Sequence, residues 1–163
     1  MTSLDKYRHV TEPAAVCARW LVGGLFVYMG LVKAVDPVQF LKLTRQYDVI
    51  QTPWLLNTVA AALPWFEVFC GLLLVAGIAV RGSALMLVAM LVPFTILVAR
   101  RALELHSALA IPLCAVKFDC GCGGGEVFAC RKLAENAGLF LLSVWLLTGS
   151  GRKLSARYSL MRR

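Results

Sequence analysis

The sequence predicts an all-α integral membrane protein, a four-helix bundle with an interfacial helix after its first span. Of the 163 residues, 60% are hydrophobic and only 16% are charged, and the mean hydropathy is +0.74. An average soluble domain has about 45–50% apolar and about 25% charged residues. A soluble core could not bury this much apolar surface, so a lipid bilayer is the expected solvent. We expect residues 1–163 to form a single membrane domain.

Long apolar segments predict the spans, because a helix needs about 20 apolar residues to cross the hydrocarbon core. Pro13 suits the first turn of the first span. The last span ends in a glycine-containing stretch followed by basic residues, which is typical of a helix C-terminus. The expected spans are approximately 13–32, 58–80, 83–99 and 133–148.

The connection between the first two spans, residues 34–57, has an amphipathic pattern. Phe40, Leu43, Tyr47 and Ile50 recur at helical spacing, with charged residues between them. This pattern predicts a short helix that lies in the membrane interface. A surface loop with an ordinary apolar stripe is the alternative.

The net charge of +8 is expected to reflect membrane topology. In a membrane protein, basic residues often mark cytoplasmic edges and contacts with anionic lipid headgroups. Nucleic-acid binding is not expected, because the sequence lacks a basic face interleaved with aromatic residues. The N-terminus does not resemble a cleavable signal. With four spans both termini share one side, and the basic residues of 152–163 place it in the cytoplasm of a bacterial inner membrane. The connection 100–132 then faces a periplasmic space, where disulfides persist.

The six cysteines fall into two groups. Cys17 and Cys70 lie inside expected spans, where a free cysteine usually acts as a small packing residue. Cys114 is left without an assigned role. The others belong to the stretch DCGCGGGEVFAC and are called the cysteine cluster: Cys120, Cys122 and Cys130.

A metal site is not predicted for the cysteine cluster. Three thiolates would need a fourth ligand such as His106 or Asp119. Structural zinc normally uses two closely spaced cysteine pairs, and the second pair is missing here.

A disulfide is the preferred interpretation of the cysteine cluster. Cys120 and Cys122 are separated by one glycine, so a bond between them would be strained and therefore exchangeable. Cys130 is expected to act as a resolving or alternate partner, because a glycine-rich loop could return it to either thiol. Arg131 and Lys132, at the start of a helix, favour the reactive thiolate. The alternative is a static disulfide that only holds the loop.

Charges inside the apolar segments are the second candidate site. Glu67 lies well within the second span, and an intramembrane acid is a functional candidate by default. Lys33, at the outer end of the first span, and Arg19, near its cytoplasmic end, are the possible partners. A purely structural ion pair, with Arg19 snorkelling to the headgroups, is the alternative.

Several motifs resemble the DoxX-like superfamily, most closely its methylamine-utilisation E (MauE) branch. They are RWLVGGLFVYMGLVKAVDPVQF, LPWFEVFCGLLLVAGIAVRG, PFTILVA and DCGC. The resemblance covers about residues 18–148 and implies a four-helix membrane bundle. The matching positions are Arg19, Gly30, Lys33, Asp36, Pro37, Pro64, Trp65, Glu67, Gly71, Gly77, Arg81, Cys120, Gly121 and Cys122. The chain departs from the family pattern after Cys-Gly-Cys, where Gly-Gly-Gly replaces the usual Phe-Gly.

The resemblance implies periplasmic thioredoxin-like partners or redox clients and, in some relatives, a quinone. We therefore expect an inner-membrane thiol–disulfide redox protein whose cysteine cluster exchanges with such a partner. Glu67 with Lys33 or Arg19 would organise the bundle or move protons during electron transfer to a quinone. The alternative is a non-catalytic small subunit of a larger membrane redox or photosynthetic complex. Its cysteine loop would be a static clamp.

Overall fold

The computed structural model describes residues 3–48, 51–121 and 125–148, with side chains from residue 13 onward. The described chain is mostly helical. Its elements, in order, are α1 (Ser3–Val35), α2 (Pro37–Gln46), α3 (Pro53–Ala76), α4 (Val80–Leu109), a 3-10 turn (Leu113–Ala115), β1 (Lys117–Asp119), β2 (Glu126–Phe128) and α5 (Ala129–Leu147).

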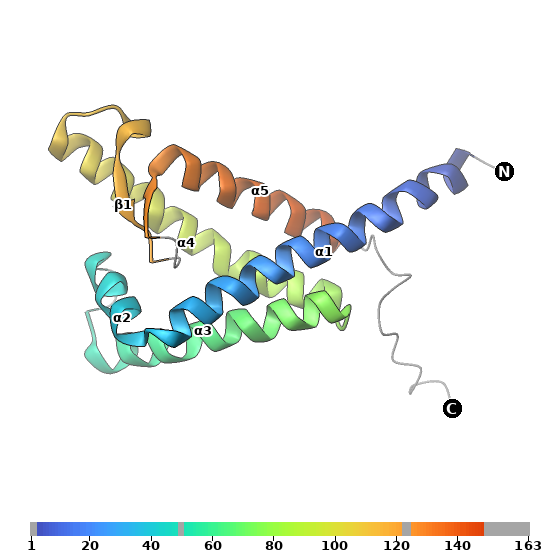
Figure 1. Cartoon of the computed structure of the whole chain (residues 1–163), viewed down its shortest axis with the longest axis horizontal. Coiled ribbons are helices and arrows are strands. Elements are labelled where there is room, and N and C mark those ends of the chain that lie inside the picture. Colours follow the sequence, from blue (N-terminus) through green and yellow to red (C-terminus); the bar gives the residue numbers. More distant parts are fainter. Residues whose placement is uncertain (1–2, 49–50, 122–124, 149–163) are drawn as a thin grey trace.

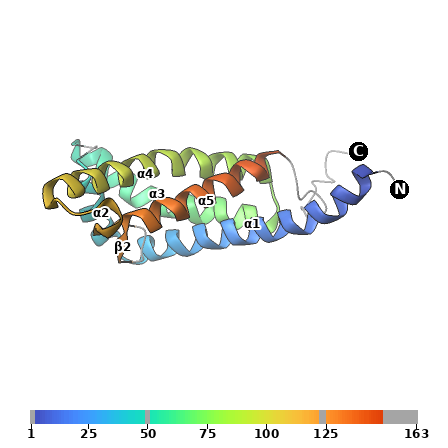
Figure 2. The same ribbon diagram turned by 90° about the horizontal axis from the view of Figure 1, so that it is seen from above.

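The four long helices, α1, α3, α4 and α5, run along the long axis of the molecule in alternating directions (Figure 1). α1 packs mainly on α3, and α4 packs mainly on α5. α2 and the antiparallel β1–β2 pair lie together at one end, which we call the hairpin end (Figures 1 and 2). The opposite end, where α1 begins and α5 finishes, is called the core end.

Three helices of the described chain are long and apolar enough to cross a membrane: Pro13–Val35, Pro53–Ala76 and Val80–Leu109. α5 is 19 residues long, and its first two turns carry Arg131, Lys132 and Glu135. These charges interrupt the apolar run, so the fourth span expected at 133–148 remains a prediction.

The helices extend further than the apolar runs alone indicated. α1 continues on the N-terminal side of Pro13, which therefore lies inside the helix and not in its first turn. α4 runs to Leu109, ten residues beyond the expected end at Ala99. Charged residues such as Arg101 and Glu104 are good helix formers. These two side chains also pair at 3.5 Å, so the helix leaves the apolar stretch without a break.

α3 begins and ends earlier than expected. Pro53 occupies its first turn, where the missing N–H costs no hydrogen bond. The helix ends at Gly77, whose φ of 74° is left-handed and whose N–H bonds back to the carbonyls of Leu73 and Leu74. The expected end of this span, Val80, is instead the first residue of α4.

A short helix does form in the connection between α1 and α3. Asp36 caps α2 by accepting a hydrogen bond from the backbone N–H of Gln39 at 2.9 Å. Phe40 is buried, whereas Lys42 and Arg45 are exposed, as the amphipathic pattern predicts. Ile50, the last member of that pattern, lies outside the described residues.

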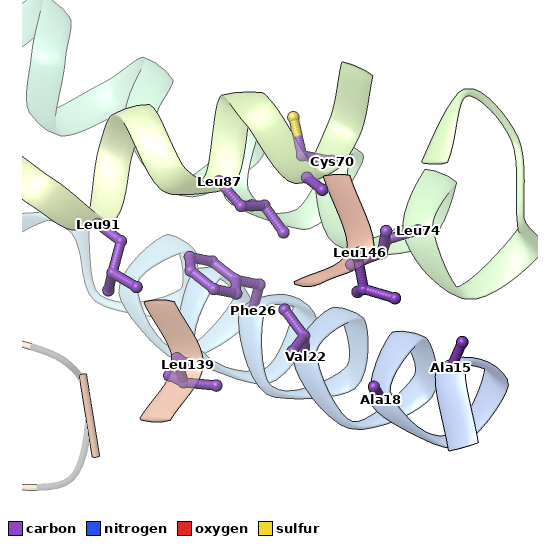
Figure 3. Close-up of a cluster of buried hydrophobic side chains, with 11 residues drawn as sticks. Ala15, Ala18, Val22, Phe26, Cys70, Leu74, Leu87, Leu91, Leu139 and Leu146 are labelled. Atoms are coloured by element: carbon purple, nitrogen blue, oxygen red, sulfur yellow. The ribbon is translucent and has the colours of Figure 1, made fainter. Parts of the chain in front are cut away.

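A close-packed apolar cluster joins α1, α3, α4 and α5 toward the core end (Figure 3). α1 and α3 approach most closely at Gly23 and Gly71. A Cβ added to either glycine would lie 2.7 Å from the carbonyl oxygen of the other, so only glycine allows this contact. The cluster consists of Ala15, Ala18, Val22, Phe26, Cys70, Leu74, Ala84, Leu87, Leu91, Leu139 and Leu146.

Candidate functional site

A buried ion pair joins α1 to α3 on the hairpin side of the molecule. The Lys33 Nζ donates to both carboxylate oxygens of Glu67 at 2.7 Å, and the two side chains are 5% and 8% exposed. The ammonium also lies 5.4 Å from the ring centroid of Phe40 and 5.7 Å from that of Phe94. Such cation–π contacts stabilise a desolvated cation. Of the two partners considered for Glu67, the structure brings Lys33 against it.

Arg19 is placed elsewhere, near the core end. Its Nε donates to the carbonyl oxygen of Leu74 at 3.1 Å, and its guanidinium also donates to that of Val75 at 3.3 Å. Carbonyls in the last turn of a helix have no partner within the helix. Arg19 is 1% exposed and therefore caps the C-terminus of α3, about 20 Å along α1 from Lys33.

A second buried cation, Lys132, was considered from the sequence only as a neighbour of Cys130. It is 6% exposed and lies 3.7 Å from a carboxylate oxygen of Glu135. Lys132 lines a small cavity of about 20 Å³ together with Lys33 and Glu67. The sequence pattern that could have indicated this burial is a stripe of residues at helical spacing on α5. Its buried members include Lys132, Asn136, Leu139, Ser143 and Leu146.

Asn136 extends this polar strip to α4. Its side-chain amide donates to the Thr95 hydroxyl at 3.1 Å, and that hydroxyl donates to the carbonyl of Leu91 at 2.7 Å. Asn136 is 1% exposed. Buried polar side chains on α1, α3 and α5, and the half-buried Thr95 on α4, therefore lie in the same part of the structure.

Cys120 is fully buried and disulfide-bonded. The loop that carries it is held from two sides. The Tyr47 hydroxyl, at the end of α2, donates to the Cys120 carbonyl at 3.1 Å. The Gly121 N–H donates to the Asp119 carboxylate at 2.9 Å, and the φ of +73° at Gly121 suits glycine. Cys122 lies outside the described residues.

Tyr47 is a stable donor for this contact. Burial and the negative charge of Asp119 raise the pKa of Tyr47 to about 12, and Arg101 opposes the shift. The phenol therefore remains protonated across the physiological range. This residue was expected only as part of an apolar stripe, because no local pattern links it to a cysteine 73 positions later.

Cys130 forms a disulfide with Cys114, with the two Cα atoms 4.8 Å apart. Cys130 was expected as a resolving or alternate partner of Cys120 or Cys122, and the structure pairs it with Cys114 instead; a role in exchange stays a prediction. The reason for the pairing with Cys114 is the β1–β2 register, in which Lys117 faces Phe128. Antiparallel pairing places the residues before β1 beside those after β2, and Cys114 is the cysteine found there.

A cavity of about 310 Å³ brings several of these residues together at the hairpin end. Cys120 lines it, as do Lys33, Glu67 and Tyr47. Arg19 and Cys130 do not belong to the lining. The remaining lining residues are mostly apolar: Phe40, Leu43, Thr44, Val59, Leu63, Ala89, Met90, Pro93, Phe94, Leu97 and Gly121.

Comparison with known proteins points to one family. No curated protein and no solved structure matches the chain. The family model of methylamine utilisation protein MauE matches residues 11–149. The match includes all three apolar helices, the cavity lining and the disulfide between Cys114 and Cys130. This chain therefore belongs to the MauE family of membrane proteins.

Proposed function

We propose that this protein is a thiol–disulfide redox protein of a bacterial inner membrane. It would form a four-helix bundle of the DoxX-like superfamily, with α2 in the interface and both termini in the cytoplasm. One observation carries the proposal: the disulfide-bonded Cys120 lines the same apolar cavity as the Lys33–Glu67 ion pair. Apolar cavities with a few convergent polar groups are typical of ligand sites.

The proposed exchange uses a disulfide between Cys120 and Cys122. Cys120 is fully buried, so a protein partner cannot reach its sulfur. We therefore assign the attack of the partner's thiolate to Cys122, with Cys120 as the leaving thiolate. The partner's second thiol then displaces Cys122 from the mixed disulfide. The partner, a periplasmic thioredoxin-like protein or client, is oxidised to its disulfide, and the Cys120–Cys122 pair gains two electrons and two protons.

A quinone fits the cavity as the group that reoxidises this pair. The lining offers apolar surfaces for a ring and one buried ammonium, on Lys33, for a ring oxygen. A bound quinone would accept the two electrons and two protons of the reduced pair. In that setting Lys33 would orient the ring, Glu67 would carry protons, and the apolar walls would exclude water.

Cys130 has a different role in this proposal from the one first expected. Its bond to Cys114 ties the 3-10 turn after α4 to the first turn of α5. We assign this bond a structural role, as a staple that holds the hairpin in place. Thiol–disulfide exchange is assigned to Cys120 and Cys122.

The test is client oxidation by the purified protein in lipid nanodiscs. A reduced thioredoxin and a decyl-tailed benzoquinone are added, and client thiols and quinone absorbance are followed together. Wild-type protein should oxidise about one dithiol per quinone reduced, whereas Cys120→Ser should be inactive. Cys17→Ser, which changes a free cysteine outside the cavity lining, is the matched control and should behave as wild type. Unchanged oxidation by Cys120→Ser would contradict the proposal.

A non-catalytic subunit of a larger membrane complex is the second candidate. The Cys114–Cys130 staple and the outward-facing aromatic residues Trp20, Tyr28, Trp65 and Phe69 favour it, since both suit a protein built for helix contacts. This function predicts a stoichiometric partner after gentle purification and thiols that exchange with no client.

A further inference from the structure

The cavity at the hairpin end opens sideways, between α3 and α4. Among the described residues that line it, the two exposed ones are Ala89 and Pro93, and both lie on α4. Lys33, Glu67 and Cys120 form its buried part. α3 and α4 are joined by a short turn at the core end and separate toward the hairpin end (Figure 1).

The opening lies at membrane depth. Ala89 and Pro93 are in the middle of α4, about 14 and 20 Å along the helix from Val80. This part of α4 belongs to one of the apolar stretches suited to crossing a membrane. A molecule that enters beside these residues therefore comes from hydrocarbon and not from water.

A surface groove on α3 adjoins the cavity. Its hollow, of about 570 Å³, lies on α3 and shares Val59 and Leu63 with the cavity. Trp65, Phe66 and Phe69 form its outer part, and all three are exposed. The cavity that holds Lys33 and the groove on the exposed surface of α3 therefore adjoin along Val59 and Leu63.

The charge of the cavity restricts its occupant. Lys33 is neutralised by Glu67 at 2.7 Å, so the buried end offers hydrogen-bond donors without a free positive charge. A phospholipid headgroup would bring a phosphate and usually needs several cations or aligned N–H groups. A neutral ring with carbonyl oxygens needs only one donor and an apolar enclosure.

We propose that a long-chain quinone enters this cavity from the bilayer between α3 and α4. Its ring would lie beside Lys33 and Cys120, and its tail would follow the groove of Val59, Leu63, Trp65, Phe66 and Phe69. This inference rests on the proposed redox function and specifies where its electron acceptor binds and how it arrives.

Binding, measured without turnover, tests the proposal. The protein in nanodiscs is titrated with a decyl-tailed benzoquinone, and the saturable quenching of tryptophan fluorescence is recorded. Trp65→Phe should lose most of that quenching. Ala89→Phe places a large side chain in the opening and should raise the apparent Kd about tenfold or more. Ala61→Phe is the matched control, because Ala61 is exposed on α3 but lines neither hollow. Equal affinity of Ala89→Phe and wild type would overturn the proposal.

Two further measurements distinguish a quinone from a phospholipid as the ligand, and quinone binding from redox activity. A tail-less benzoquinone should bind at least about tenfold more weakly; equal affinity would overturn the assignment of the groove to the tail. Displacement of the quinone by phospholipid alone would also overturn the proposal. If wild type binds the quinone but never oxidises a dithiol, the redox function fails and the binding site stands.

Discussion

The two ends of the described structure differ in how tightly they are packed and in how much charge they bury. At the core end, apolar side chains from all four long helices pack closely, and glycines bring the α1 and α3 backbones into contact. At the hairpin end, α1, α2, α3 and α4 line a cavity that also contains a buried ion pair and a disulfide-bonded cysteine. The difference indicates that the core end supplies stability, which lets the hairpin end keep empty space and charge.

The two ends also treat charge differently. Arg19, at the core end, binds backbone carbonyls that belong to a helix terminus. Lys33 and Glu67, toward the hairpin end, bind each other beside the cavity. A ligand in the cavity would therefore lie beside the second arrangement.

The largest expected effect is at the ion pair. Lys33→Met leaves the Glu67 carboxylate buried without its partner, and breaking a buried pair in this way typically costs about 3–5 kcal/mol. Thermal unfolding in detergent should show a large loss of stability. The double variant Lys33→Met with Glu67→Met should regain most of it, because no charge is left unpaired. A single variant as stable as wild type would show that the hairpin end does not depend on this pair.

The staple should have the next largest effect. Cys114→Ser with Cys130→Ser removes a cross-link between residues 16 positions apart, and closing a loop of this size is worth about 3 kcal/mol. We expect a lower unfolding temperature under oxidising conditions and no change under reducing conditions. Client oxidation should persist in the surviving folded fraction. Loss of that oxidation at full stability would instead place Cys114 and Cys130 in the exchange reaction.

At the core end, the glycine contact gives a smaller effect. A Cβ at Gly71 would lie 2.7 Å from the Gly23 carbonyl oxygen. Gly71→Ala must therefore push α1 and α3 apart, and overpacking of this kind costs about 1–3 kcal/mol. Gly24→Ala is the control, since no atom outside its own helix turn lies within 4 Å of the added Cβ. It should be neutral or stabilising by up to about 1 kcal/mol. Equal unfolding temperatures for both variants would refute the close contact.

The smallest effect concerns Tyr47. Tyr47→Phe removes its hydrogen bond to the Cys120 carbonyl, which is typically worth about 1 kcal/mol. The pKa of Tyr47 is raised to about 12, against about 10 for an unfolded tyrosine. Its contribution is therefore fully present below about pH 10 and is lost as the pH rises toward 12. The stability difference between wild type and Tyr47→Phe should shrink over that range; a constant difference would contradict the assignment.

Much of the helical framework could be predicted because apolar runs report burial or lipid contact directly. The ends of α1 and α4 could not, since polar residues continue a helix as well as apolar ones do. The β1–β2 pair also escaped prediction. Its strands are three residues each, too short for an alternating pattern to emerge.

The ion pair was within reach of the sequence because an acid in an apolar segment requires a partner. The bond between Cys114 and Cys130 was not, because spacing does not determine disulfide connectivity. The contact of Tyr47 with Cys120 depends on where α2 places its last turn, which only the folded chain defines. The redox roles of Cys120 and Cys122 and the binding of a quinone stay predictions.

The position of Arg19 and Lys33 on the same helix has a consequence for biosynthesis. A charged residue in a lone transmembrane helix opposes insertion, by about 2.5–3.5 kcal/mol at the centre and by less toward the ends, where Arg19 and Lys33 lie. Arg19 and Lys33 both find hydrogen-bond acceptors on α3, at Leu74, Val75 and Glu67. We expect α1 to be retained poorly by the bilayer until α3 has left the ribosome. Nascent chains arrested while α3 is still inside the ribosomal exit tunnel should integrate less well than chains arrested after α3 has emerged, as resistance to alkaline extraction would reveal.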